Sequence, residues 1–114
     1  MGAVEGPDAG PLVDRLAAVA SAPRMRILAA LAAEDLHVSE LARRMGTSRQ
    51  LLYLHLTKLE QAGYVGGTLE LGPDGKAVKT YRLLPFSFTV DIGTVLAEVR
   101  AHDAGAGGAR AQDT

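Results

Sequence analysis

The stretch from residue 38 to 65, VSELARRMGTSRQLLYLHLTKLEQAGYV, constrains the fold more than any other part of the chain. Its pattern indicates two short helices joined by a tight turn. Gly46 can adopt the left-handed backbone conformation that ends a helix. Thr47 can cap the next helix, and Gln50 three residues later completes the spacing of a capping box. The sequence therefore predicts a two-helix unit whose second helix begins at Thr47 and closes at Gly63.

The second helix of this unit is predicted to have two different faces. At about 100° per residue, Leu52, Leu56 and Leu59 fall within one narrow arc, which is typical of a buried face. The outer arc and its flanks carry polar side chains that suit base edges and phosphates. The candidate nucleic-acid contacts here are Thr47, Ser48, Arg49, Gln50, Tyr53, Leu54, Thr57 and Lys58. On the helix alone, an ordinary amphipathic helix with a solvated face is an equally good interpretation.

The distribution of charge favours the nucleic-acid interpretation. The chain has 114 residues and a formal net charge of −1, which does not by itself indicate a nucleic-acid partner. Residues 43–84, however, carry seven Lys and Arg against three Asp and Glu, so this segment has a net charge of +4. A local basic segment is the electrostatic footprint of a duplex-binding surface. Because +4 is a small charge, we expect one copy to bind DNA weakly and with a strong dependence on salt.

A β-hairpin is predicted directly after the two-helix unit. Residues 68–71 and 78–83 alternate between polar and apolar side chains, and GPDG at 72–75 is a strong turn signal. Tyr81 and Leu83 share one parity and are expected to turn partly inward. Lys76 and Lys79 are predicted to contact backbone phosphates. The alternative is an edge hairpin on which the lysines prevent aggregation.

The remaining segments predict three more helices and a short crossing. Ser21 can cap a central helix with Pro23 in its first turn, and this helix offers apolar core positions at Met25, Ile27, Leu28 and Leu31. The first helix of the two-helix unit is expected over 39–45, and Phe86 and Phe88 are expected to cover the core. The fold class is therefore mainly α with a β-hairpin, an α+β domain over 11–103. Residues 1–10 and 104–114 are predicted to be disordered tails.

The two terminal helices each carry an apolar stripe. Apolar residues recur at helical spacing between residues 11 and 20 and again between 91 and 102, at the ends of a chain whose core is nearly complete without them. Asp91 lies in the first turn of the last helix and suits its dipole. Two such stripes are most simply explained as a dimer interface, formed by Leu12, Leu16, Val19, Ile92, Val95, Leu96 and Val99.

The sequence gives no support to several other classes of function. The chain has no cysteine, which excludes disulfides and thiolate metal sites. No apolar run approaches the roughly 20 residues of a membrane span, and the start of the chain lacks a signal pattern, so a cytoplasmic location is expected. No glycine-rich phosphate loop, nucleophile elbow or His-Glu-His helix is present, so the protein is not expected to be an enzyme.

The element order and the segments SAPRMRILAAL, SELARRMGTS, HLTKLEQAGYV and KTYRL resemble the ArsR/SmtB family of winged-helix transcriptional regulators. The likeness covers roughly Leu12–His102. It implies a winged helix-turn-helix homodimer joined by its first and last helices, with a reading helix at 47–61 in the major groove and a wing at 68–83. Tyr53 and Leu54 depart from the family, which usually has polar residues there, so base contacts are expected to be partly apolar.

Many members of that family sense metals, and in some of them the ligands lie on the last helix. Glu98 and His102 are weak candidates at i, i+4, and N/O ligands of this kind suit nickel or zinc. A plain helix-surface pair is the favoured alternative. Metal could also be sensed through a protein partner. His55 is interpreted as a packing residue and His37 as a loop residue.

The sequence thus predicts a sequence-specific regulator that binds double-stranded DNA as a homodimer, at an operator that is an inverted repeat. The alternative is a winged-helix interaction module that acts through a protein partner with weak or no direct DNA binding. Salt-dependent, sequence-selective duplex binding separates the two.

Overall fold

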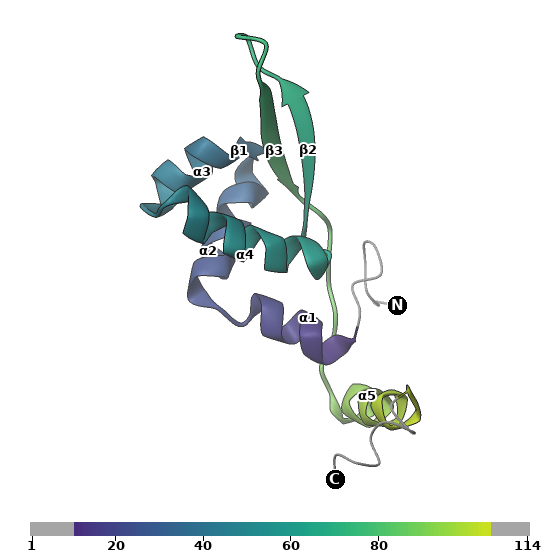
Figure 1. The fold of residues 1–114 in the computed structure, drawn as a ribbon. Coiled ribbons are helices and arrows are strands. Elements are labelled where there is room, and N and C mark those ends of the chain that lie inside the picture. Colours follow the sequence, from purple (N-terminus) through teal and green to yellow (C-terminus); the bar gives the residue numbers. More distant parts are fainter. Residues whose placement is uncertain (1–10, 106–114) are drawn as a thin grey trace.

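The computed structural model describes residues 11–105, and the predicted order of elements is confirmed (Figure 1). The α+β class is as expected, with one short additional strand. The elements are α1 (Leu12–Val19), α2 (Ala22–Ala33), β1 (Leu36–His37), α3 (Val38–Met45), α4 (Arg49–Gln61), β2 (Val65–Leu71), β3 (Ala77–Leu83) and α5 (Ile92–Gly105).

The predicted tails at 1–10 and 104–114 lie outside the described residues, except for residues 104 and 105. These two belong to α5, which therefore ends later than the expected domain boundary at 103. The alanine at 104 favours helix, so α5 continues past that boundary.

Helix α2 begins as predicted. The hydroxyl Oγ of Ser21 accepts a hydrogen bond from the backbone N–H of Arg24 at 3.3 Å, and a proline lies in the first turn. Ile27, Leu28 and Leu31 are buried, but Met25 is exposed. The prediction of Met25 as a core residue was wrong because its position lies outside the arc that the three buried residues share.

The sheet has the strand order β1-β3-β2 and is antiparallel throughout. Val65 pairs with Leu83 and marks the start of β2, so this strand begins three residues before the predicted Thr68. Glycines at 66 and 67 conceal that extension because glycine carries no strand propensity. His37, expected in a loop, instead lies in β1 opposite Thr80. A two-residue strand is too short to show any periodicity.

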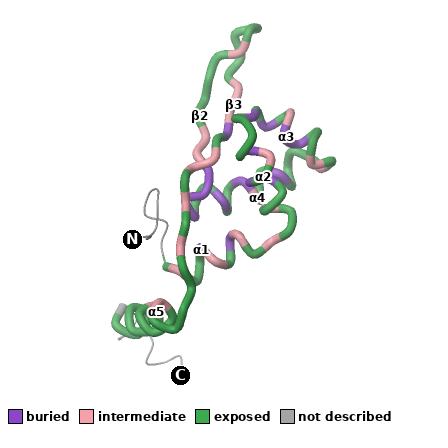
Figure 2. Tube along the Cα trace, turned by 180° about the vertical axis from the view of Figure 1, so that it is seen from behind, coloured by how far each residue is buried: buried purple, intermediate pink, exposed green. Residues whose placement is uncertain are grey.

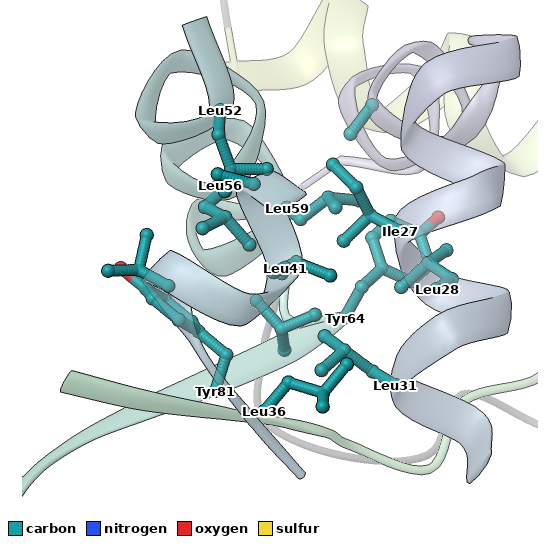
Figure 3. Close-up of a cluster of buried hydrophobic side chains, with 14 of the residues drawn as sticks. Ile27, Leu28, Leu31, Leu36, Leu41, Leu52, Leu56, Leu59, Tyr64 and Tyr81 are labelled. Atoms are coloured by element: carbon teal, nitrogen blue, oxygen red, sulfur yellow. The ribbon is translucent and has the colours of Figure 1, made fainter. Parts of the chain in front are cut away.

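The core lies between α2, α3, α4 and the near end of the sheet (Figure 3). The predicted buried face of α4 is confirmed, since Leu52, Leu56 and Leu59 are fully buried. Phe86 and Phe88 pack against this core from the segment that follows β3, as expected. The Phe86 ring meets the Tyr64 ring edge-on, with centroids 4.6 Å apart.

Helix α5 lies apart from the rest of the molecule (Figure 1). With α5 included, the structure measures 54 × 32 × 24 Å along its principal axes. Nearly all of α5 is exposed (Figure 2). One hydrogen bond joins it to α1: the backbone N–H of Val13 donates to Oε2 of Glu98 at 3.0 Å. Glu98 thereby satisfies one of the free N–H groups in the first turn of α1, where Pro11 provides no side-chain cap.

Within residues 11–105, no single helix is both long and apolar enough to cross a membrane. The pair α1 and α2 meets the length and composition criteria together, but the two helices are bent by 84° at their junction.

Candidate nucleic-acid interface

The turn between α3 and α4 positions the candidate reading helix. Gly46 has a φ of 65°, the left-handed conformation predicted for it. The backbone N–H of Thr47 then donates to the carbonyl oxygen of Ala42 at 3.2 Å and closes α3. This hydrogen bond and the left-handed Gly46 fix the direction in which the chain enters α4.

The residue that caps α4 is Ser48, not Thr47. Its backbone is extended, and its Oγ accepts a hydrogen bond from the N–H of Leu51 at 3.1 Å. Helix α4 therefore begins at Arg49, and the predicted capping box of Thr47 with Gln50 does not form. Both Thr47 and Ser48 are common capping residues, and the cap falls on serine, the more favourable of the two residue types.

The outer surface of α4 carries the predicted contacts. Opposite its buried leucines, the helix exposes side chains that can donate and accept hydrogen bonds, interrupted by the apolar Leu54 and the aromatic Tyr53. The predicted residues that the structure leaves exposed on α4 are Arg49, Gln50, Tyr53, Leu54, Thr57 and Lys58. Ser48 is exposed and Thr47 is half-buried just before them.

The tip of the β2–β3 hairpin presents Lys76 to solvent. Gly75 has a φ of 84° in the turn, and the backbone N–H of Lys76 donates to Oδ1 of Asp74 at 3.0 Å. Arg82 is a second exposed cation on this hairpin, and its Nη1 lies 3.4 Å from Oγ1 of Thr68. Arg82 was not among the predicted contacts. Successive side chains of a strand point to opposite faces, so the inward position of Tyr81 indicates an outward position for Arg82.

Lys79 lies on β3 opposite Leu69 of β2, and its side chain extends to the reading helix. Its Nζ is 3.9 Å from Oε1 of Glu60 on α4 and 5.2 Å from the centroid of the Tyr81 ring. Burial raises the pKa of the Tyr81 hydroxyl, and the Lys79 ammonium opposes that shift. The two predicted wing lysines therefore differ, since Lys76 is exposed to solvent and Lys79 is paired with Glu60.

Two arginines of the basic segment are held by carboxylates on α3 and just before it. Arg43 and Arg44 both pair with Glu40, and Nε of Arg44 lies 2.8 Å from Oε2 of Glu40. Arg44 also reaches Glu34 at 3.1 Å. Hydrogen bonds from both guanidinium groups lower the pKa of Glu40 to about 2. The charge available to a phosphate backbone is therefore smaller than the +4 of the segment suggests.

Arg24 on α2 makes side-chain contacts with both α1 and α4. Its Nε donates to the carbonyl oxygen of Ala18 at 2.6 Å, and its Nη1 lies 3.1 Å from Nδ1 of His55. Burial, and secondly the positive charge of Arg24, lower the pKa of His55. His55 is half-buried, which confirms its interpretation as a packing residue.

The apolar stripe of α5 is exposed. Ile92 is 71% exposed, and Val95, Leu96 and Val99 are exposed as well. On α1, Leu12 and Leu16 are half-buried, whereas Val19 packs against the core of its own chain. Val13, which was not predicted, is exposed on α1.

The candidate metal ligands of α5 do not form a site within one chain. Glu98 is engaged with the N–H of Val13, and His102 is exposed. The part of the chain that the structure describes contains no group of three His, Asp or Glu side chains placed to hold a metal ion. Two ligands are fewer than the three or four protein ligands that zinc usually takes.

Comparison with known proteins agrees with this architecture. A family model of a helix-turn-helix domain matches residues 19–64. No curated protein sequence matches the chain. Among solved structures, HlyU from Vibrio cholerae is similar at 32% identity, with 64% of this chain and 74% of that chain covered and a TM-score of 0.56. The transcriptional regulator HlyU from Vibrio vulnificus is similar at 32% identity, with 64% and 71% covered and a TM-score of 0.54.

A third similar structure, from Mycobacterium bovis, is described as a homodimeric winged helix-turn-helix DNA-binding domain and a possible ArsR-family regulator. It is 23% identical, covers 83% of this chain and 85% of that chain, and has a TM-score of 0.53, so it supports the fold alone. The α3–turn–α4 unit and the β2–β3 hairpin define a winged helix-turn-helix protein. The chain belongs to the winged helix-turn-helix transcriptional regulators, a class that binds DNA.

Proposed function

We propose that this protein is a sequence-specific transcriptional regulator of the ArsR type that binds double-stranded DNA as a homodimer. The observation that carries the proposal is the outer face of α4, which is fixed by a left-handed glycine turn and a serine cap and is exposed along its length. In this proposal α4 enters the major groove, where its polar side chains contact base edges. The exposed Lys76 at the tip of the wing contacts backbone phosphate.

The homodimer is part of the proposal because of α5. An exposed helix with four exposed apolar side chains, joined to α1 by one hydrogen bond within the described residues, is unfavourable for an isolated chain. Covering these side chains with α1 and α5 of a second copy removes them from water at roughly 25 cal/mol per Å². A two-fold dimer also sets two reading helices about one duplex turn, roughly 34 Å, apart. The operator is then an inverted repeat. A nickel or zinc response at Glu98 and His102 would need further ligands from that second copy.

A second candidate function is a winged-helix interaction module that acts through a protein partner. Leu54 is 63% exposed at the centre of the reading face, and ion pairs neutralise part of the basic segment. Both features suit a protein partner better than a duplex.

Selection of bound fragments from genomic DNA tests the proposal against this alternative. The purified full chain is mixed with sheared DNA at 150 mM salt, and the retained fragments are sequenced. Enrichment of a common inverted repeat supports the proposal. Retention of no fragments, or of fragments without a common site, supports the interaction module.

A further inference from the structure

A cavity of about 340 Å³ lies beside the reading helix, between α2 and the first two turns of α4. Its volume falls in the range of small-molecule sites, which is roughly 300–1,000 Å³. Most of its wall is apolar, formed by Pro23, Ile27, Met45, Leu51 and Leu52. Leu51 is nearly half-exposed on α4. The cavity therefore offers a partly open apolar surface that residues 11–105 leave uncovered.

The charged group of the cavity is Arg26. It is exposed, and within residues 11–105 it makes no ion pair or side-chain hydrogen bond. Arg43 and Arg44, by contrast, are both held by Glu40. An arginine has only donors and stays protonated, so Arg26 offers a planar cationic fork to an acceptor that carries negative charge.

The second polar group of the cavity wall is His55. Because the guanidinium group of Arg24 has no acceptor, its contact with Nδ1 at 3.1 Å makes Nδ1 the acceptor and leaves the ring proton on Nε2. Both Arg26 and His55 are therefore hydrogen-bond donors toward other groups. Within the described residues, no carboxylate lines this cavity. A ligand that matches this wall has an apolar body and an anionic acceptor.

We propose that this cavity binds a small apolar carboxylate, with its carboxylate on Arg26 and its hydrocarbon part against the apolar wall. The occupant contacts Leu51 and Leu52 of α4 and Thr47 of the turn that sets the start of α4. It also adds a negative charge beside the basic surface. On the proposed function as a DNA-binding regulator, such a ligand lowers the affinity for the operator.

Nuclear magnetic resonance of the full chain without DNA tests the binding itself. The protein is titrated with phenylacetate, with the neutral isostere phenylacetamide, and with inorganic phosphate. We expect phenylacetate to shift the backbone amides of Thr47, Leu51 and Leu52, with an affinity about tenfold above that of phenylacetamide because a charge-assisted hydrogen bond is lost in the amide. Phosphate, which lacks the apolar part, should shift these amides weakly.

Two matched variants locate the carboxylate. Arg26→Gln removes the exposed cation of the cavity and should lower the phenylacetate affinity about tenfold. Arg100→Gln, an exposed arginine on α5, removes the same charge far along the chain and should leave that affinity unchanged. Both positions are exposed, so both variants should fold, which circular dichroism verifies.

The proposal is overturned if phenylacetate gives no shifts at these amides, if phenylacetamide binds equally well, or if Arg26→Gln binds like the wild type. It is also overturned if phosphate binds at these amides as tightly as phenylacetate does, since the site is then a simple anion contact suited to the DNA backbone. Each titration lacks DNA, so failure of this proposal is distinguishable from failure of the proposed DNA-binding function. Addition of phenylacetate to a DNA-binding assay then measures the predicted loss of operator affinity.

Discussion

The ammonium of Lys79 lies 3.9 Å from Oε1 of Glu60 and joins strand β3 of the wing to the reading helix. Lys79 and Tyr81 occupy the same face of β3, so the ammonium also lies over the Tyr81 ring. This arrangement gives Lys79 a role in positioning the wing, whereas Lys76 at the tip remains available to a phosphate.

The two wing lysines should therefore respond differently to replacement. Lys76→Met should weaken binding to all duplexes alike and reduce the salt slope by about one unit, because one phosphate contact is lost. Lys79→Met keeps the apolar stem against Tyr81 and should leave the salt slope unchanged, because its charge is paired with Glu60. Fluorescence anisotropy across a salt series measures both slopes. An equal reduction by Lys79→Met would mean that Lys79 leaves Glu60 to contact DNA.

The proposed dimer makes a prediction about α5. Leu96→Glu places a charge in the exposed apolar stripe and should yield a monomer by light scattering, since an unpaired charge is costly to bury in an interface. Ala97→Glu adds the same charge to the opposite side of α5 and should leave the dimer intact. DNA affinity should fall strongly in Leu96→Glu alone. A monomeric wild-type protein, or a Leu96→Glu variant that still dimerises, would remove the basis for this assembly.

The buried hydroxyl of Tyr64 should contribute to stability. It donates to the carbonyl oxygen of Arg15 at 2.6 Å and ties α1 to the end of the α4–β2 connection. Tyr64→Phe should lower the free energy of unfolding by about 1 kcal/mol, because one buried hydrogen bond is lost. Urea denaturation measures the change, with Tyr53→Phe on an exposed ring as the control that should show none. A Tyr64→Phe variant as stable as the wild type would show that this bond adds nothing.

The ion pairs of Glu40 predict a pH dependence. Since the pKa of Glu40 is lowered from 4.5 to about 2 in the folded chain, its contribution to stability is present above pH 4.5 and is lost as the pH falls through 2. Exposure to solvent screens these pairs, so we expect a small effect on unfolding. A ¹³C-detected titration of the Glu40 carboxyl group should give a midpoint well below its ordinary value of 4.5. A midpoint near 4.5 would show that Arg43 and Arg44 do not hold it in solution.

Periodicity was sufficient to predict most of the fold. The buried leucines of α4, the left-handed Gly46 and the Ser21 cap each follow from a few neighbouring residues, and each is confirmed. Local choices between similar residues were harder to predict. Thr47 and Ser48 are adjacent and can both cap a helix, and the structure places the cap on Ser48, the more favourable residue type.

Contacts between distant segments could not be predicted from local patterns. Arg15 is only 5% exposed, and its guanidinium carbon lies 4.9 Å from the centroid of the Phe88 ring, although arginines in short terminal helices are usually exposed. The position of Lys79 in its pair with Glu60 could be predicted, since Lys79 and Tyr81 are two residues apart on one strand and share its inward face. The partner Glu60 depends on how the hairpin packs on α4, which no local pattern specifies.

The central claim is that the outer face of α4 reads DNA, and Arg49 and Lys58 are its exposed cations. The most direct test is fluorescence anisotropy at fixed salt with the selected operator and a scrambled duplex of the same length. The wild type should bind the operator at least about 10³-fold more tightly than the scrambled duplex. The double variant Arg49→Ala with Lys58→Ala should retain its thermal unfolding midpoint and lose this preference. Equal binding of both duplexes by the wild type, or an unchanged operator affinity in the double variant, would contradict the account.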